Sequence, residues 1–526
     1  MMSPPCIRKA DAKPGFQRDE IPLAEGAGRQ RLPAFAPAFT PIKIFFQTRQ
    51  DSLPVGRTIL PDALHHHDTE GYEAMAIKYN RRAGAFENLY AEAGLPGDVR
   101  RGLNWILGGN LFGTLHGVVC GGGTAALVGL AGMLGAGDME FGLLVAIPQI
   151  AALLQIPFSL LVNRTHKRKI YMLTIGLVSR LLWMLFGFLP LLSRVPESQL
   201  PLITLISLLG ISSALGAVIN VCWFPWFSDL APLRIRGRWL SLRDTLTAVG
   251  SLLFGLLVAY LLDVLPVDSK YIVIFLIGGG LGVLDMVCFA FAPEVWTAKP
   301  KKAPMHKTIL EALRNKPFMR LTVMWTAWNF TANLSGAYLT PYAMNSMGLN
   351  FMQITIFGTV AASMATVLAV PRWGRTLDQF GSKNVMLIGC IGASLTPAFY
   401  LFSTPGNIWP TLLHNVIGAL FWSASNLAAN SMQLSASPDE SRPTYIALFS
   451  CITALAGVAL GTLCGGWFLE GCNAAGWFTG SFDRYKVLIL LSVVLRFGFT
   501  LLLVPPMSNE NDATLRDALK GLTGRA

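Results

Sequence analysis

Long apolar runs dominate the chain between residues 102 and 507. Each run holds about 20 residues, the length that an α-helix needs to cross roughly 30 Å of hydrocarbon, and short polar or Pro- and Gly-rich connectors separate the runs. A bilayer core offers no water to backbone amides, so runs of this length predict helices. We predict twelve membrane-spanning helices, over residues 103–133, 140–162, 170–192, 202–228, 239–263, 271–293, 318–345, 352–373, 385–403, 408–435, 445–469 and 485–506.

A basic connector divides the predicted helices into two sets of six. It contains Lys299, Lys301 and Lys302, followed by an amphipathic stretch. We therefore predict an all-α integral membrane protein. Its predicted parts are an N-terminal six-helix half over residues 102–293, a cytoplasmic linker over 294–317, a C-terminal six-helix half over 318–507 and a cytoplasmic tail over 508–526.

The segment before the first predicted helix has a different composition. Residues 1–74 are rich in Pro, Ala, Gly and Arg and lack the pattern of a signal peptide, so we predict that they are disordered. Met75 opens a basic leader over residues 75–101, and we predict that the native chain starts there. Three adjacent histidines, 65–67, lack a fixed geometry for a metal on such a tail, so we assign no metal and no cofactor.

The charge of the chain is strongly positive, with a net value of +12, which raises the question of a nucleic acid partner. The basic residues gather in alternate connectors, whereas the other connectors hold only Arg194, Lys270, Arg484 and Lys486. Lys and Arg are enriched in cytoplasmic loops of membrane proteins. The pattern therefore predicts a multi-pass protein of a bacterial-type inner membrane with both termini in the cytoplasm, and it needs no nucleic acid.

Two pairs of connectors repeat between the halves. The connector after the eighth predicted helix carries Gly374, Asp378, Gly381 and Lys383, and the one after the second carries Asn163 and Arg164 at matching positions. The connectors after the fourth and tenth helices repeat Pro, Arg and an aromatic residue at one fixed spacing: Pro232, Arg236 and Trp239, then Pro438, Arg442 and Tyr445. Internal repeats of this kind are typical of transporter folds.

The connector from Gly374 to Lys383 resembles the Gly-x-x-x-Asp-Arg/Gln-x-Gly-x-Lys/Arg loop motif of the major facilitator superfamily. The resemblance covers about residues 100–507 and implies twelve helices in two pseudo-symmetric halves and secondary transport by alternating access. It also implies a cytoplasmic gate built from the repeated connectors. We expect Gly374 to permit close helix approach, Asp378 to cap a helix or pair with a cation, and Gly381 to permit a tight turn. The other gate residues expected from the repeats are Asn163, Arg164, Arg236, Lys383 and Arg442.

The resemblance further implies that the first, fourth, seventh and tenth helices face a central cavity, where hydrocarbon would not tolerate polar residues. The seventh helix carries Trp325, Asn329 and Asn333, and the tenth carries Trp422, Asn426 and Asn430, each set at a spacing of four that places it on one face. We call these two sets the Trp/Asn stripes and predict that they bind the solute. Additional candidates from other helices are Asn110, Gln149, Asn220 and Trp223. The alternative interpretation is that the amides join helices and the indoles anchor at the membrane surface.

The Trp/Asn stripes offer neutral hydrogen-bonding groups beside flat apolar rings. This chemistry favours a neutral hydroxylated solute, such as a sugar or a nucleoside, transported by a monomer with H⁺ or Na⁺ as a candidate coupling ion. Export of amphiphilic cations is an alternative because aromatic cavities accept them, and a solute sensor of the same fold is another. Motifs of membrane-embedded enzymes are absent from the sequence, so we predict no enzymatic activity.

Charged residues inside the predicted helices are few. Arg180 and Asp285 lie at similar depths, and we predict that they form a structural ion pair because an unpaired membrane charge costs several kcal/mol. For Arg496 we expect the side chain to extend to the membrane surface or to a lipid head group. The candidates for proton coupling are His116, His414 and Asp244, and the sequence leaves facilitated diffusion, proton symport and sodium coupling open.

Overall fold

The computed structural model describes residues 85–165, 167–192, 199–294, 305–438, 441–478, 480 and 483–507. The predicted disordered segment, its three histidines, most of the linker and the tail lie outside the described residues, and so do the side chains of Asn163 and Arg164. Every regular element within the described ranges is helical.

Within the described residues, the first half of the bundle comprises ten helices and two short 3₁₀ segments. These are α2 (Ala85–Glu92), α3 (Gly97–Val119), α4 (Ala125–Met133), α5 (Asp138–Ala151), η1 (Ala152–Leu154), α6 (Gln155–Thr165), α7 (Arg168–Leu185), η2 (Phe186–Phe188), α8 (Leu189–Leu192), α9 (Leu200–Leu230), α10 (Leu233–Val264) and α11 (Val267–Phe291). We refer to them as the N-terminal half.

The second half, which we refer to as the C-terminal half, has the same style of long helices with local irregularities. Its elements are α12 (Met305–Arg314), α13 (Lys316–Gly336), α14 (Leu339–Asn345), α15 (Phe351–Thr355), the π-helix η3 (Ile356–Val360), α16 (Ala361–Phe380), α17 (Ser382–Leu395), the 3₁₀ segment η4 (Thr396–Phe402), α18 (Trp409–Ser435), α19 (Arg442–Ile452), the π-helix η5 (Thr453–Ala459), α20 (Leu460–Ala474) and α21 (Arg484–Leu503).

Nine segments of the described chain are long and apolar enough to cross a membrane, and they coincide with nine of the twelve predicted spans. The other three predicted spans coincide with α3–α4, α13–α14 and α18. These helices carry more polar residues than the rest, and α18 alone holds His414, Asn415, Asn426 and Asn430. The described helices are therefore consistent with twelve membrane-spanning segments, and three of these segments are less apolar than the rest.

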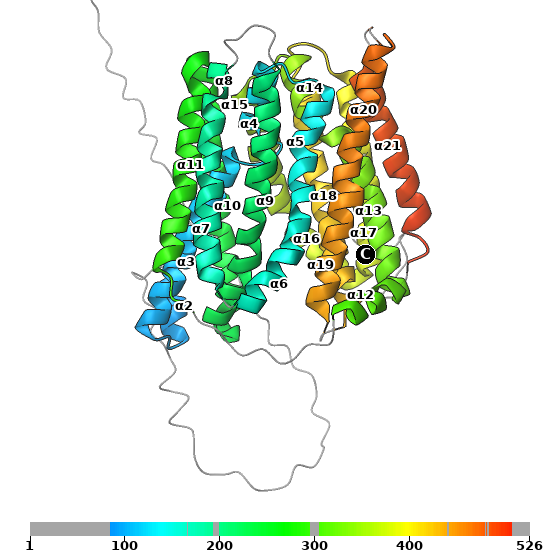
Figure 1. The fold of residues 1–526 in the computed structure, drawn as a ribbon. Coiled ribbons are helices and arrows are strands. Elements are labelled where there is room, and N and C mark those ends of the chain that lie inside the picture. Colours follow the sequence, from blue (N-terminus) through cyan, green and yellow to red (C-terminus); the bar gives the residue numbers. More distant parts are fainter. Residues whose placement is uncertain are drawn as a thin grey trace, which may run out of the picture. The chain divides into compact units, whose positions relative to one another are not determined.

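The long helices run side by side, and their ends gather into two layers (Figure 1). We call the layer that holds α2 and α12 the α12 end and the opposite layer, which holds α14 and α15, the α15 end. The described chain begins with α2 at the α12 end, and α21 returns to that end. Both ends of the described chain thus lie in one layer.

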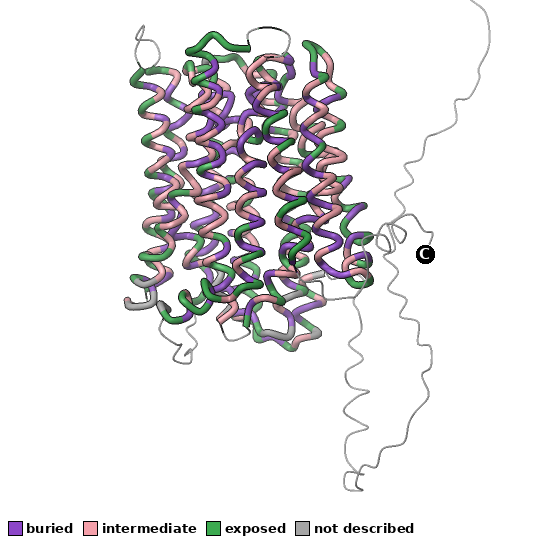
Figure 2. The backbone as a smooth tube through the Cα atoms, turned by 90° about the vertical axis from the view of Figure 1, so that its right-hand side faces the viewer, coloured by how far each residue is buried: buried purple, intermediate pink, exposed green. Residues whose placement is uncertain are grey.

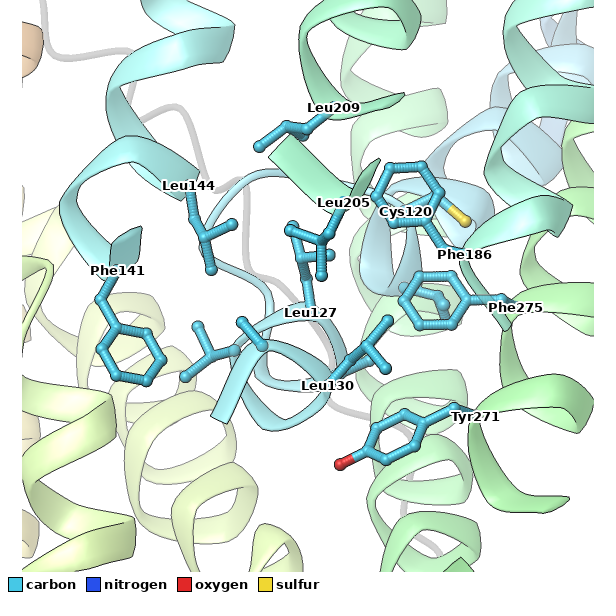
Figure 3. Close-up of a cluster of buried hydrophobic side chains, with 14 of the residues drawn as sticks. Cys120, Leu127, Leu130, Phe141, Leu144, Phe186, Leu205, Leu209, Tyr271 and Phe275 are labelled. Carbon is cyan, nitrogen blue, oxygen red and sulfur yellow. The ribbon is translucent and has the colours of Figure 1, made fainter. Parts of the chain in front are cut away.

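Buried and exposed residues alternate along the helices of the bundle (Figure 2). On α16 the exposed face consists of large apolar side chains, with Val367 71% exposed and Leu368 64% exposed. Contact of such a face with water would be unfavourable, whereas lipid chains accept it. In the N-terminal half, α4 packs between α5, α9 and α11 through Leu127 and Leu130, and this forms the apolar cluster of Figure 3.

Polar contacts join the two halves at the α15 end. The carboxylate of Asp263 on α10 accepts hydrogen bonds from the backbone amides of Phe351 (3.0 Å) and Met352 (2.8 Å), which begin α15 in the other half. Asp138 at the start of α5 accepts a hydrogen bond from Tyr485 and lies 3.3 Å from the guanidinium of Arg484. Helix N-termini attract carboxylates, so the Asp263 contact links the halves electrostatically.

Each half begins with a short helix that packs at the α12 end, and the repeated aromatic residue lies beside it. In the N-terminal half, Trp239 donates a hydrogen bond to the Tyr90 hydroxyl of α2 (3.0 Å), which in turn donates to Asn104 (3.0 Å). Burial raises the pKa of Tyr90, partly offset by the bond from Trp239. In the C-terminal half, Tyr445 packs on Phe318, two residues into the helix that follows α12.

Glycines recur at a spacing of four in both halves: Gly113, Gly117 and Gly121 along and just after α3, and Gly457, Gly461 and Gly465 along η5 and α20. We call these two sets the glycine stripes, and their surroundings differ. On the helix formed by η5 and α20, a methyl group added at Gly461 would meet the Phe330 carbonyl of α13, so backbone packs on backbone there. On α3, a methyl group added at Gly117 would meet nothing within 4 Å. Close packing through glycine is therefore present along α20 but not at Gly117.

Candidate functional site

A cavity of about 840 Å³ lies inside the C-terminal half. Its walls come from α13, α14, α16, α17, η4, α18, η5 and α21, and α18 contributes the largest share of the lining residues. Pockets for small organic ligands typically measure about 300 to 1,000 Å³, so this volume suits one such molecule.

Five carboxamides line the cavity. They are Asn329, Asn333, Asn415, Asn426 and Asn430. Four of them donate a hydrogen bond from Nδ2 to the carbonyl oxygen four residues earlier, for example Asn329 to Trp325 (2.8 Å) and Asn426 to Trp422 (3.1 Å). This bond fixes the side chain against its own helix. The amide oxygens of Asn329 and Asn426 accept no hydrogen bond within the described ranges, and both are available to a ligand.

Three indoles form a ladder next to these amides. Trp325 stacks on Trp328 with ring centroids 5.2 Å apart, and Trp328 contacts Trp422 at 4.6 Å. Trp422 is 36% exposed and lines the cavity, whereas Trp325 is only 7% exposed and lies in the packing beneath it. The Trp/Asn stripes therefore meet at one cavity. Trp325 was predicted to face the solute together with the other stripe residues, but it is not among the residues that line this cavity.

Arg496 of α21 lines the same cavity, which corrects our expectation that it reaches the membrane surface. Its side chain is 4% exposed and its guanidinium lies 5.5 Å from the centre of the Trp328 ring. The helix directs this side chain into the interior of the half because Ser492, Arg496 and Thr500 occupy one buried face at a spacing of four. The cavity thus contains fixed positive charge, which the sequence analysis did not foresee.

The candidates from the N-terminal half do not line this cavity. Asn110 is half-buried and donates a hydrogen bond to the Ile106 carbonyl (2.7 Å), and Asn220 is exposed. Trp223 stacks near Phe227 and lies under the Arg243 guanidinium at 4.9 Å, and Gln149 is half-buried on α5. These four residues are not among those that line the cavity described here, and their role in solute binding stays a prediction.

The three candidates for proton coupling occupy different environments. His414 lines the cavity, and its Nδ1 is buried without a hydrogen-bond partner in the described structure. His116 is buried in the N-terminal half, with Nδ1 2.9 Å from the Gly278 carbonyl oxygen. Asp244 has an exposed side chain that contacts Arg243. Of the three, His414 is the candidate in contact with the cavity.

The predicted partners Arg180 and Asp285 lie in contact. Arg180 Nη2 is 2.9 Å from Asp285 Oδ2, and the side chains are 14% and 3% exposed. The pair joins α7 to α11 and borders α3, because a methyl group added at Gly113 would meet the Asp285 carboxylate. A small residue at Gly113 is needed for this close approach.

The gate residues expected from the repeated connectors lie at the α12 end. Gly381 has a φ of 83°, which favours glycine, and it forms the sharp turn between α16 and α17. Lys383 donates to the Pro505 carbonyl (2.5 Å), and Arg236 donates to the Ala231 carbonyl (2.9 Å). The expectation that Gly374 permits close helix approach is wrong, because a methyl group added there would meet nothing within 4 Å.

The sequence analysis missed an ion cluster at the same end. Arg168, which begins α7, contacts Asp229 of α9 (2.6 Å) and Glu294 after α11 (3.6 Å), and its side chain is 1% exposed. The sequence analysis predicted no ion pair among these residues, which lie at helix ends. It also missed Asn415, although that residue precedes Asn426 by eleven positions, about three helical turns, and so shares its face.

Comparisons with known proteins give a family and a fold. Residues 111–462 match the sequence model of the Major Facilitator Superfamily, and no curated protein matches the chain. The chain is similar to a bacterial homologue of the human lysosomal transporter Spinster in an inward-facing, unoccupied conformation, with 15% identity, a TM-score of 0.55 and coverage of 80% of this chain and 100% of that one. Similar values hold for the nucleoside transporter NupG (13%, 0.52, 77% and 99%) and for a D-xylose–proton symporter (17%, 0.53, 76% and 97%).

Proposed function

The chain belongs to the Major Facilitator Superfamily, and we propose that it transports a small hydroxylated organic solute by alternating access. The cavity of the C-terminal half is the proposed solute site. The observation that carries this proposal is the set of five carboxamides around one cavity beside the exposed ring of Trp422. Hydroxyl groups can donate to the amide oxygens, and the apolar face of a sugar or nucleoside can stack on an indole.

Alternating access requires that the halves separate at one end while they close at the other. The contacts of Asp263 with α15 and of Asp138 with Arg484 join the halves at the α15 end, and they would have to break in a transport cycle. We propose that the α12 end faces the cytoplasm. In support, both ends of the described chain lie there, with basic residues such as Arg314 and Lys383.

Export of amphiphilic cations is disfavoured by the charge of the cavity. Its lining contains Arg496 and no Asp or Glu among the described residues, so a cationic solute would meet repulsion without compensation in a low dielectric. The earlier preference for a strictly neutral solute depended on a cavity without fixed charge. Arg496 removes that premise while leaving the argument for hydroxyl groups intact.

Counterflow in proteoliposomes tests transport directly. Vesicles that contain the purified protein are loaded with an unlabelled sugar, nucleoside or hydroxy acid, and uptake of the labelled compound is followed. Counterflow needs no ion gradient, so with Na⁺ present and the pH equal on both sides it reports on transport whether H⁺, Na⁺ or neither drives the protein. Binding in detergent without any counterflow would instead indicate a solute sensor.

Amide variants test the site. We expect Asn329→Ala and Asn426→Ala to weaken binding of the transported solute about tenfold each, since each removes hydrogen bonds to it. Asn110→Ala is the matched control, because Asn110 makes the same bond to its own helix but does not line the cavity. Equal losses in all three variants would contradict the site.

A further inference from the structure

The guanidinium of Arg496 is poorly satisfied by the protein. Nη1 donates to the Ala393 carbonyl at 3.3 Å, and Nη2 donates to the Ala332 carbonyl at 3.2 Å and to Ser492 Oγ at 3.3 Å. Hydrogen bonds of a charged donor are usually about 2.7–2.9 Å long, so all three contacts are long. Nε is buried and has no partner in the described structure.

The charge of Arg496 has no counter-charge in the described part of the chain. No described carboxylate forms an ion pair with it, and the face of Trp328, with its centre 5.5 Å away, is the remaining electrostatic contact. A buried arginine without a partner is unfavourable by several kcal/mol, and membrane proteins normally place an acid beside it. The side that is open to a counter-charge is the cavity.

We propose that the solute bound in this cavity is a hydroxylated carboxylate, whose carboxylate pairs with Arg496 while its hydroxyl groups bond the asparagine amides. This inference rests on the proposed function and narrows its substrate class. Arginine presents its donors in a planar fork that matches the two oxygens of a carboxylate. The long Nη contacts leave these donors available for such a bidentate contact.

The charge balance favours one carboxylate over a phosphate ester. A single guanidinium neutralises a single negative charge, whereas a phosphate monoester carries close to two at neutral pH. The other polar groups in the lining are amides, hydroxyls, the Trp422 indole and the His414 ring. The ring of His414 lines the same cavity and can add a hydrogen bond to the solute.

Pairs of compounds that differ in the carboxylate test the inference. The purified full-length protein is titrated with D-glucuronate and D-glucose, D-gluconate and D-sorbitol, and L-lactate and 1,2-propanediol, with the intrinsic fluorescence of its tryptophans as the readout. We expect the acid of at least one pair to bind about tenfold or more tighter than its neutral partner. Glucose 6-phosphate is included to distinguish a phosphate from a carboxylate.

Variants assign the preference to Arg496. We expect Arg496→Gln to lower the affinity for the acid to that for its neutral partner without changing the affinity for the neutral compound. Arg496→Lys keeps the charge and should keep part of the preference. Arg372→Gln is the control, because Arg372 is exposed on α16, bonds the Leu368 carbonyl and does not line the cavity. Unchanged binding of the neutral partner also shows that the Gln variant is folded.

The outcomes separate this inference from the proposed function. Equal binding of the acid and its neutral partner, or a preference for the acid that survives Arg496→Gln, would overturn the inference that the solute carries a carboxylate. The proposal that the solute is hydroxylated would not be affected. Tighter binding of glucose 6-phosphate than of any carboxylate would also overturn the inference of a carboxylate. If no compound binds, or only hydrophobic cations bind, the proposed function fails and the inference fails with it.

Discussion

Arg180 of the N-terminal half and Arg496 of the C-terminal half are both arginines inside membrane-spanning helices, yet their surroundings differ. Arg180 contacts the carboxylate of Asp285 at 2.9 Å, and no cavity is needed to explain it. Arg496 contacts two backbone carbonyls and one hydroxyl, and the cavity lies beside it. One charge is compensated within the fold, and the other is left for a ligand to compensate.

This difference extends to the halves as a whole. In the N-terminal half, Gly113 brings α3 against Asp285, and α4 fills the space between α5, α9 and α11. In the C-terminal half, the polar residues of α13 and α18 surround open volume. Low dielectric penalises unpaired polar groups, so the amides and the guanidinium that border this volume would gain from a bound solute.

The largest expected effect comes from Asp285→Leu, which leaves Arg180 buried without its partner. We expect the free energy of unfolding to fall by roughly 3–5 kcal/mol, as for other broken buried pairs. Thermal unfolding in detergent measures the loss. The double variant Arg180→Met with Asp285→Leu should recover most of it, because no uncompensated charge is left. An unfolding temperature of Asp285→Leu equal to that of the wild type would contradict the role of the pair.

Glycine variants test the difference in backbone packing between the two glycine stripes, and their expected effect on stability is smaller. Gly461→Ala places a methyl group against the Phe330 carbonyl, and we expect overpacking to cost roughly 1–3 kcal/mol. Gly117→Ala meets open space and should be neutral or stabilising by up to about 1 kcal/mol through helix propensity. Thermal unfolding compares the two. Equal effects would indicate that close backbone packing does not distinguish the stripes.

The sequence predicted the fold because its signals are local or repeated. Helix length follows from the thickness of hydrocarbon, and the matched spacing of Trp239 and Tyr445 reports the duplication. The positions of Asn329 and Asn426 beside one cavity could also be predicted from the sequence, since a spacing of four places residues on one helix face. Whether those residues bind a solute stays a prediction.

Tertiary contacts explain what the sequence did not reveal. The carbonyls of Ala332 and Ala393 lie far from Arg496 in sequence, so the residues around position 496 do not predict these contacts. Asn220 resembles Asn426 in its position within its half, but whether a helix face meets open volume depends on neighbouring helices. Arg168, Asp229 and Glu294 come from three separate helix ends, which only the fold brings together.

Asp263 tests the link between the halves and has a smaller expected effect. Asp263→Ala removes the carboxylate that caps α15, and we expect a loss of about 1 kcal/mol, typical of a helix cap. Hydrogen exchange should become about fivefold faster in α15 and also in α5 across the interface. Asn350→Ala is the control, because Asn350 caps α15 from its own half through Gln353 (2.8 Å). Faster exchange confined to α15 in both variants would show that Asp263 does not hold the halves together.

The smallest change in stability is expected for Arg496→Met in ligand-free protein. Methionine removes the charge and three long hydrogen bonds while filling similar space, so we expect a change within about 1 kcal/mol, or a gain in stability. Arg180→Met should instead be strongly destabilising, because it leaves the buried Asp285 carboxylate alone. Thermal unfolding of the two variants without solute makes the comparison. If Arg496→Met loses as much stability as Arg180→Met, then the charge of Arg496 is already compensated within the fold. The buried arginines of the two halves would then not differ in this respect.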